Sequence, residues 1–140
     1  MILPAGYKFT AREWPWQNFK PEELACRHCG EIYYWPEFMD ALQALRERAG
    51  RPIRLLSGHR CALHNARVGG APLSQHLRLA VDVSLIGVEV SLLGHDRQEL
   101  AKQARAQGFT GLGYYQNFLH LDMGRKRYWF GGDEAKKLWV

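Results

Sequence analysis

Residues 74–83, SQHLRLAVDV, place a carboxylate inside a run that otherwise has the composition of a buried strand. Asp82 lies within the apolar run, and His76 comes just before it. An ionised carboxylate among apolar side chains is strongly destabilising unless a cationic partner compensates its charge. Whatever fold this chain adopts must therefore bring such a partner to Asp82.

A second stretch, FLHLDM (118–123), has a comparable pattern. Side chains alternate between the two faces of a strand, so His120 and Asp122 share one face with Phe118. The apolar residues between them occupy the other face. The stretch therefore predicts a strand with one polar face and one buried face.

We expect this strand to neighbour LAVDVSL (79–85), so that Asp82 and His120 are presented from one sheet surface. His76, on the loop that enters the earlier strand, would fold over that surface. Two histidines and one carboxylate match a catalytic zinc site, in which three protein ligands leave a fourth position for water or substrate. The alternative is that each of the three is an ordinary polar side chain satisfied in a half-buried strand.

The loop SGHRCALHNARVGG (57–70) follows another predicted strand and places Arg60 near the same surface. A guanidinium there would hold a substrate carboxylate or carbonyl through two hydrogen bonds. The alternative is a surface arginine in a salt bridge. Asn65 and the glycine pair 69–70 are expected to shape the loop.

The order of the predicted elements indicates a single α+β domain with a mainly antiparallel sheet flanked by helices. Pro36 and Gly50 bound the clearest helix, and Asp96 and Gly108 bound a second one. Strands are predicted at 52–57, 79–85, 110–115 and 118–124, the last two as a hairpin, with a short helix near the C-terminus. Residues 1–18 are interpreted as an N-terminal arm packed on a domain of residues 19–140.

The composition adds few constraints. The chain has 140 residues, enough for one domain with its own core, and a net charge of +5, which favours an anionic partner such as nucleic acid or bacterial cell wall. The first residues lack the features of a secretory signal, and no stretch approaches the roughly 18 apolar residues of a membrane span. We therefore expect synthesis in the cytoplasm without a signal peptide.

Three cysteines leave several possibilities open. Cys26 and Cys29, in CRHC, could be half of a structural zinc site that Cys61 and a histidine complete. They could equally be reduced thiols, or one of them could form a disulfide with Cys61.

One known superfamily resembles this sequence in a combination of motifs: SGHR, HN, VGG, SQH, a strand aspartate and a late HLD. It is that of the zinc D-alanyl-D-alanine carboxypeptidases and murein endopeptidases, which includes VanX-type dipeptidases, phage endolysins and the hedgehog signalling domain. The resemblance covers about residues 19–130 and is greatest to the small bacterial and phage-borne branch. It implies a hedgehog/DD-peptidase-like fold.

Carried over to this sequence, the resemblance implies that His76, Asp82 and His120 bind one catalytic Zn²⁺. It also implies that Arg60 contacts substrate or the developing oxyanion, and that Ser74 positions the loop or donates a hydrogen bond. One departure is evident, because the two ligands His76 and Asp82 are six residues apart, one fewer than is usual in the superfamily.

The general base is a second departure. Several branches place a carboxylate or histidine shortly before the last zinc ligand, whereas this chain has GYYQNF there. Asp122 is the best remaining candidate for a catalytic base; its alternative role is to orient a metal ligand or Arg60. Tyr115 and His59 are weaker candidates.

The function that the resemblance implies is zinc-dependent hydrolysis of peptide bonds in peptidoglycan stem peptides, by a carboxypeptidase or an endopeptidase. Such a protein would act at the cell wall, reached through a phage-type lysis system, or within a phage-like tail or gene-transfer particle. The alternative is a catalytically weak or inactive wall-binding or structural module of the same fold. Nucleic-acid binding through GRKRYWF is not expected, because that basic run is short and matches the family's own ending.

Overall fold

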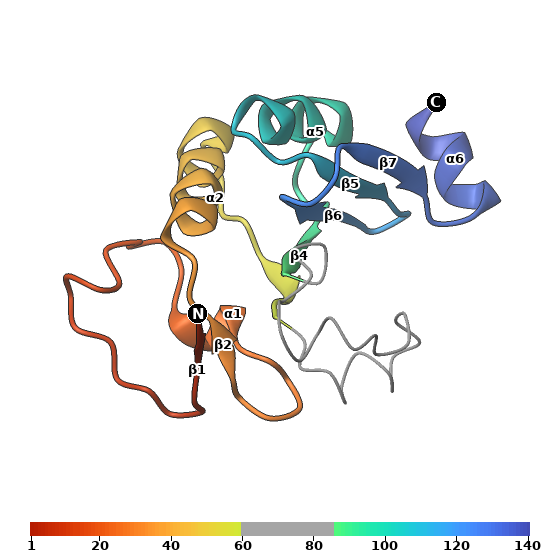
Figure 1. The fold of residues 1–140 in the computed structure, drawn as a ribbon. Helices are drawn as coiled ribbons and strands as arrows, with labels where there is room; N and C mark the ends of the chain where they lie inside the picture. The colour runs from red at the N-terminus through yellow and green to blue at the C-terminus, as the bar shows by residue number, and fades with distance from the viewer. Residues whose placement is uncertain (60–85) are drawn as a thin grey trace.

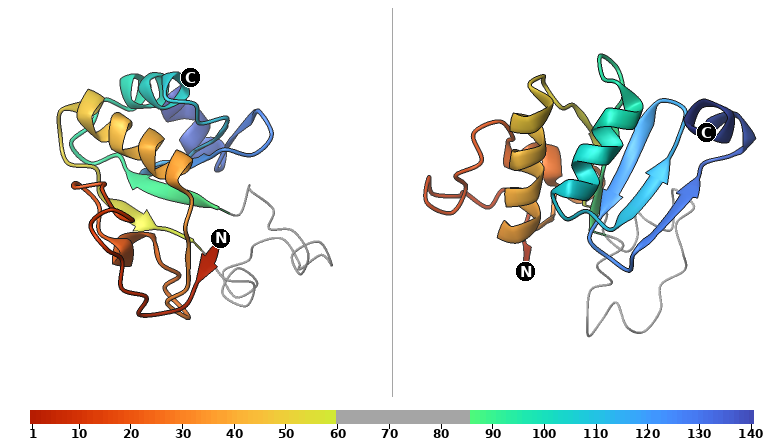
Figure 2. Two further views of the ribbon diagram at one scale, coloured as in Figure 1. Left: turned by 60° about the vertical axis from the view of Figure 1, so that its left-hand side comes forward. Right: turned by 90° about the horizontal axis from the view of Figure 1, so that it is seen from above.

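The computed structural model describes residues 1–59 and 86–140. Within them, a five-stranded sheet is covered on one face by helices α2 (Pro36–Ala49) and α5 (Arg97–Ala106), which lie side by side (Figures 1 and 2). The predicted α+β class is confirmed.

Both long helices begin and end at the signals that their sequences carry. Proline occupies the first turn of α2, and Gly50 ends it with a left-handed φ of 65°. Asp96 caps α5 by accepting a hydrogen bond from the Glu99 amide at 2.9 Å, and Gly108 follows with a φ of 104°. The two predicted helices are therefore confirmed.

The sheet has the strand order β3-β4-β6-β5-β7. Its strands are β3 (Leu55–Ser57), β4 (Gly87–Ser91), β5 (Gly111–Tyr114), β6 (Phe118–Asp122) and β7 (Arg127–Phe130). All neighbouring pairs are antiparallel except β5 and β7, which are parallel. The expectation of a mainly antiparallel sheet, with a β5–β6 hairpin, is confirmed.

Two strands of this five-stranded sheet differ from the sequence expectation. β4 lies at 87–91, where no strand was predicted, and it pairs directly with β6. β7 was not predicted either, and it forms an edge of the sheet beside β5. The predicted strand at 79–85 lies outside the described residues. The expectation that it neighbours the FLHLDM strand is wrong, because β6 pairs with β4 along one edge and with β5 along the other.

The N-terminal segment is tied to the domain by backbone and aromatic contacts. Strand β1 (Ile2–Leu3) pairs with β2 (Ile32–Tyr33), and the single-turn helix α1 (Pro21–Leu24) lies between them in sequence. Trp16 is buried and donates its Nε1 hydrogen to Asp40 of α2 at 2.8 Å. These contacts join β1 to β2 and Trp16 to α2.

The C-terminal helix α6 (Asp133–Trp139) packs beside β5 and β7. Trp139 is buried, and its Nε1 donates to the Tyr115 carbonyl at 2.8 Å. Across the described ranges, the helices are too short or too polar to traverse a lipid bilayer.

Alternation gives the sheet two different faces. The face under α2 and α5 is apolar, and its residues belong to the main core, including Val88, Val90, Leu112, Leu119 and Leu121. The strand pairings place the intervening residues of β4, β6, β5 and β7, including His120 and Asp122, on the opposite face. The predicted division of FLHLDM into a core face and a polar face is confirmed.

A leucine pair on the helix side tests this description of the core. Leu42 of α2 has no exposed surface, whereas Leu93, in the loop after β4, is 86% exposed. Leu42→Ala should lower the free energy of unfolding by about 2–5 kcal/mol, because a cavity remains in the packed core. Leu93→Ala should change it by no more than about 0.5 kcal/mol. Urea denaturation measures both values, and similar small effects for the two variants would contradict this packing.

Candidate metal centre

Of the predicted site residues, the structure describes two. His120 and Asp122 lie on β6, while Arg60, Ser74, His76 and Asp82 all fall within 60–85, outside the described residues. The described part of the candidate site is the polar face around β6.

Asp122 is the most constrained side chain of that face. It has no exposed surface, and three groups of the described residues bind its carboxylate. Arg127 makes a two-pronged contact, with Nη1 3.0 Å from Oδ1 and Nη2 2.8 Å from Oδ2. The Gly124 amide donates to Oδ1 at 2.9 Å, and Nε2 of His120 lies 2.6 Å from Oδ2.

These contacts keep the buried carboxylate ionised. Burial alone would raise the pKa of Asp122, but the hydrogen bonds from His120, Arg127 and the Gly124 amide outweigh it and lower the pKa to about 2. The compensating partner of this aspartate is thus an arginine from β7, supported by a histidine of its own strand.

The protonation of His120 follows from its partner. An ionised carboxylate only accepts hydrogen bonds, so Nε2 of His120 must carry the hydrogen that points to Asp122. In the neutral ring Nδ1 then holds a lone pair, and no described residue makes a hydrogen bond to it. A histidine whose other nitrogen donates to a carboxylate is the usual arrangement of a metal ligand.

Two glycines make room for this group. A Cβ on Gly111, which pairs with both Asp122 and Arg127, would lie 2.0 Å from Asp122 Oδ1 and 2.4 Å from Arg127 Nη1. A Cβ on Gly87 of β4 would lie 2.8 Å from Cε1 of His120. Any larger residue at these positions would displace the ion pair or the imidazole ring.

Aromatic rings form one side of the group. The Trp129 ring lies 5.1 Å from the His120 ring, centroid to centroid, and the Arg127 guanidinium lies 5.0 Å from the same indole. Trp129 Nε1 donates to the Tyr115 hydroxyl at 2.9 Å, and Tyr115 stacks on Phe118. These contacts restrict the side-chain rotation of His120 and Arg127.

Sequence reasoning missed one carboxylate of this surface. Glu89 of β4 lies directly opposite His120 in the sheet and is half-buried, and Ser57 of β3 lies opposite Glu89 on its other side. Cross-strand partners share a face, with Cβ atoms about 4.5–5.5 Å apart. The alternation in GVEVS was the available signal, but it only becomes informative once β4 is known to pair with β6.

The other described histidines and cysteines considered as bases or ligands lie away from the group around Asp122. His59 is buried, neither of its ring nitrogens has a hydrogen-bond partner among residues 1–59 and 86–140, and burial lowers its pKa. His95 contacts the Pro52 carbonyl through Nε2 at 3.0 Å. The Cys29 thiol lies 3.3 Å from a Glu31 carboxylate oxygen, and the Cys26 sulfur accepts from the His28 amide.

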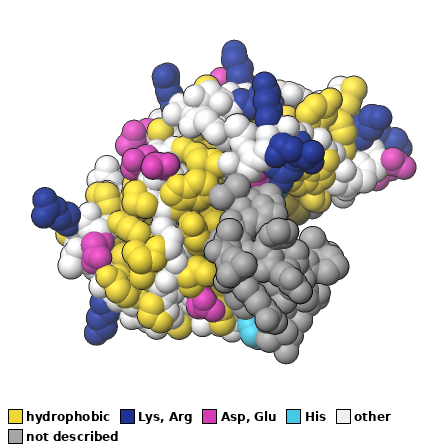
Figure 3. All heavy atoms as spheres, viewed as in Figure 1, with side chains coloured by type: hydrophobic (Ala, Val, Ile, Leu, Met, Phe, Trp, Pro, Cys, Tyr) yellow, Lys and Arg dark blue, Asp and Glu magenta, His cyan; other side chains and the backbone are white. Residues whose placement is uncertain are grey.

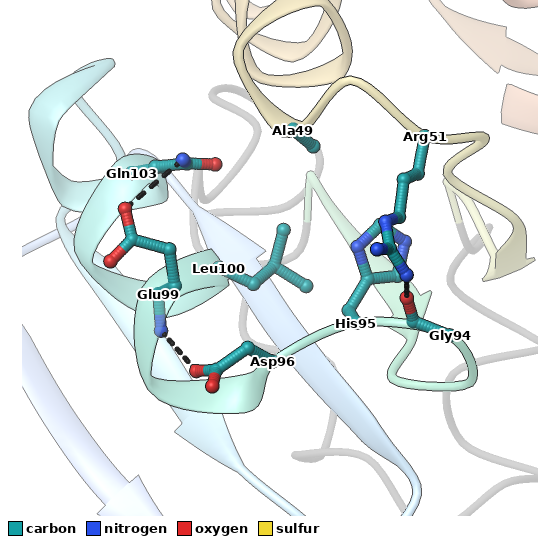
Figure 4. Close-up of a pocket in the computed structure, with 8 residues that line it drawn as sticks. All are labelled: Ala49, Arg51, Gly94, His95, Asp96, Glu99, Leu100 and Gln103. Atoms are coloured by element: carbon teal, nitrogen blue, oxygen red, sulfur yellow. Dashed lines mark hydrogen bonds between the residues drawn. The ribbon is translucent and has the colours of Figure 1, made fainter.

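A separate hollow lies between the end of α2 and the start of α5 (Figure 4). Its polar groups pair with one another: Arg51 donates to the Gly94 carbonyl, and Gln103 to the Glu99 carboxylate. The Glu99 amide in turn binds the capping Asp96. These contacts belong to the helix cap and the adjoining loop.

Within residues 1–59 and 86–140, no three histidine, cysteine or acidic side chains converge as a metal site requires. The described part therefore offers one nitrogen ligand, Nδ1 of His120, in a setting that fits Zn²⁺. The other predicted ligands, His76 and Asp82, stay predictions.

On the one face that Figure 3 draws, the described residues form no basic stripe of the kind that binds nucleic acid. Lysine and arginine side chains are spread among apolar ones there.

Comparison with known families finds a match over most of the chain. The sequence model of the family described as Peptidase M15 matches residues 17–122, which include His120 and Asp122 but not Arg127. No curated protein matches the chain.

The close approach at Gly111 provides a test of the site geometry. Gly111→Ala should lower the free energy of unfolding by about 1–3 kcal/mol, because the new methyl group would displace the buried ion pair. Lys126→Ala, on the exposed turn before β7, should change it by less than about 0.5 kcal/mol. Urea denaturation compares the two, and an equally stable Gly111→Ala variant would contradict the described packing.

Proposed function

Because the chain belongs to the Peptidase M15 family, we propose that it is a zinc-dependent hydrolase of peptide bonds in bacterial peptidoglycan stem peptides. It would act as a carboxypeptidase or an endopeptidase. The observation that carries the metal-dependent part is the geometry of His120, whose Nε2 is held by a buried carboxylate while Nδ1 keeps its lone pair.

Three residues would hold the metal: His120 through Nδ1, together with His76 and Asp82 from the segment 60–85. When bound, Zn²⁺ supplies Lewis-acid activation of a water molecule and of the scissile carbonyl. The fixed hydrogen bond to Asp122 makes the His120 ring a better electron donor and holds its orientation. Arg60 would bind a substrate carboxylate or carbonyl, and Ser74 would position the loop.

Asp122 fits the orienting role better than the role of general base. Its carboxylate is fully buried and already accepts hydrogen bonds from Arg127, Gly124 and His120. A general base must reach the water whose proton it removes. Glu89, half-buried and opposite His120 on the same face, is the better placed carboxylate among the described residues, and we assign it the proton-accepting role.

The site of action follows the same proposal. The substrate would be the stem peptide of the cell wall, reached through a phage-type lysis system or as part of a phage-like particle. The net charge of +5 supports this proposal, because it favours retention on an anionic envelope.

Removing the proposed ligand tests the function. His120→Ala should abolish stem-peptide hydrolysis and reduce bound zinc, measured by elemental analysis of the purified protein and by product chromatography. His95→Ala is the matched control, because His95 binds a backbone carbonyl, and it should keep both properties. Bound zinc without any hydrolysis by the unmodified protein would instead favour a wall-binding module, and hydrolysis that survives His120→Ala would overturn the proposal.

Replacing the proposed base tests its role separately. Glu89→Gln should lower kcat by about 100-fold or more at unchanged zinc affinity, because the amide cannot accept the proton. Glu99→Gln makes the same chemical change on the surface of α5 and should leave kcat unchanged. A kcat for Glu89→Gln close to that of Glu99→Gln would exclude the assignment.

A further inference from the structure

Arg127 lies beyond the residues that the family match covers, yet it contributes to the candidate site. It comes from β7, and β5 separates it from β6, which carries His120 and Asp122 (Figure 1). Its guanidinium crosses over Gly111 of β5 to reach both oxygens of Asp122, at 3.0 and 2.8 Å. The absence of a side chain at Gly111 permits this contact.

The contact continues to His120. Both oxygens of Asp122 are held by Arg127, so the carboxylate plane is fixed, and Oδ2 faces Nε2 of His120 at 2.6 Å. A planar guanidinium bound at two points fixes orientation as well as charge. Trp129 contacts the two residues that flank Asp122 in this series, because its ring packs on His120 and on the Arg127 guanidinium.

We infer that Arg127 is a positioning residue of the candidate metal centre, which acts through Asp122 to fix the ring orientation and the Nε2–H tautomer of His120. Its effect on metal affinity rests on the proposed function, whereas its effect on the tautomer does not. Arg127 touches neither substrate nor metal in this account.

The charge balance explains why an arginine is needed at this position. Asp122 has no exposed surface, and Arg127 is the only described cationic side chain besides the titratable His120 that contacts it. Without Arg127, His120 and the Gly124 amide would be the remaining partners among the described residues, and the carboxylate would lose the contact that fixes its plane. The imidazole could then rotate or exchange its hydrogen between the two nitrogens.

The test compares two neighbouring arginines in the full-length chain. Arg127→Gln removes the guanidinium that binds both oxygens of Asp122. Arg125→Gln changes an exposed arginine just before β7 and keeps the backbone carbonyl of residue 125 that Arg127 contacts. Long-range ¹H–¹⁵N spectra of the metal-free proteins report the tautomer of His120, and competition with a chromophoric chelator reports affinity for Zn²⁺. Circular dichroism verifies that each variant is folded.

The unmodified protein and Arg125→Gln should show a single Nε2–H tautomer with a hydrogen protected from exchange. Arg127→Gln should lose that protected signal and bind Zn²⁺ about 10- to 100-fold more weakly, as expected for loss of an outer hydrogen-bonding partner. Arg127→Lys, which restores the charge without the planar fork, should recover part of both properties. If Arg127→Gln does not fold, the lysine variant supplies the comparison.

The inference would be overturned if a folded Arg127→Gln variant kept the protected Nε2–H signal in full, as Arg125→Gln does. If Arg127→Gln does not fold, the same full signal in Arg127→Lys would overturn it. If none of the proteins binds Zn²⁺ but the tautomer still depends on Arg127, the proposed function fails while the positioning role stands. If zinc binds equally to all variants although the tautomer changes, the effect on metal affinity is refuted.

Discussion

The buried charge of Asp122 is the constraint on which the polar face of the sheet depends. A carboxylate without exposed surface is stable only when donors satisfy it, and breaking such a buried pair typically costs about 3–5 kcal/mol. Here the donors come from three places: the guanidinium of Arg127, the Gly124 amide and the ring of His120. The parallel pairing of β7 with β5 brings the arginine into reach, and Gly111 leaves the space through which it passes.

The two faces of the sheet contribute differently to the protein: one to the core and one to the candidate site. The face under α2 and α5 supplies the apolar burial that stabilises the domain. The opposite face carries His120, Asp122 and Glu89 on adjacent strands, with Trp129 beside them. Alternate residues of the same strands form the two faces, so the core fixes the backbone from which the candidate site projects.

Local patterns predicted much of this arrangement. The caps and apolar spacing of α2 and α5, and the alternation of FLHLDM, are short-range signals, and the structure confirms them. The strand β4 was missed because its five residues follow an apolar run that had been interpreted as a strand of its own. Glu89 was consequently not recognised as the residue opposite His120.

The partner of Asp122 could not be predicted in the same way. Arg127 is only five residues further along the chain, but its contact requires a parallel strand pair with Gly111 between the two side chains. That is a property of the assembled sheet, and the sequence pattern of RKRYWF indicated only a basic, aromatic tail. The proposal that His76 and Asp82 are zinc ligands rests on the sequence resemblance, since both residues lie outside the described ones.

The central claim is that this face presents Nδ1 of His120 to a metal ion while Asp122 holds Nε2. A crystal structure of the zinc-loaded protein, with anomalous data collected at the zinc absorption edge, tests it most directly. We expect an anomalous peak about 2.0–2.1 Å from Nδ1, with the contact between Nε2 and Asp122 intact. A metal bound to Nε2 with Asp122 displaced, or no metal at His120, would contradict it.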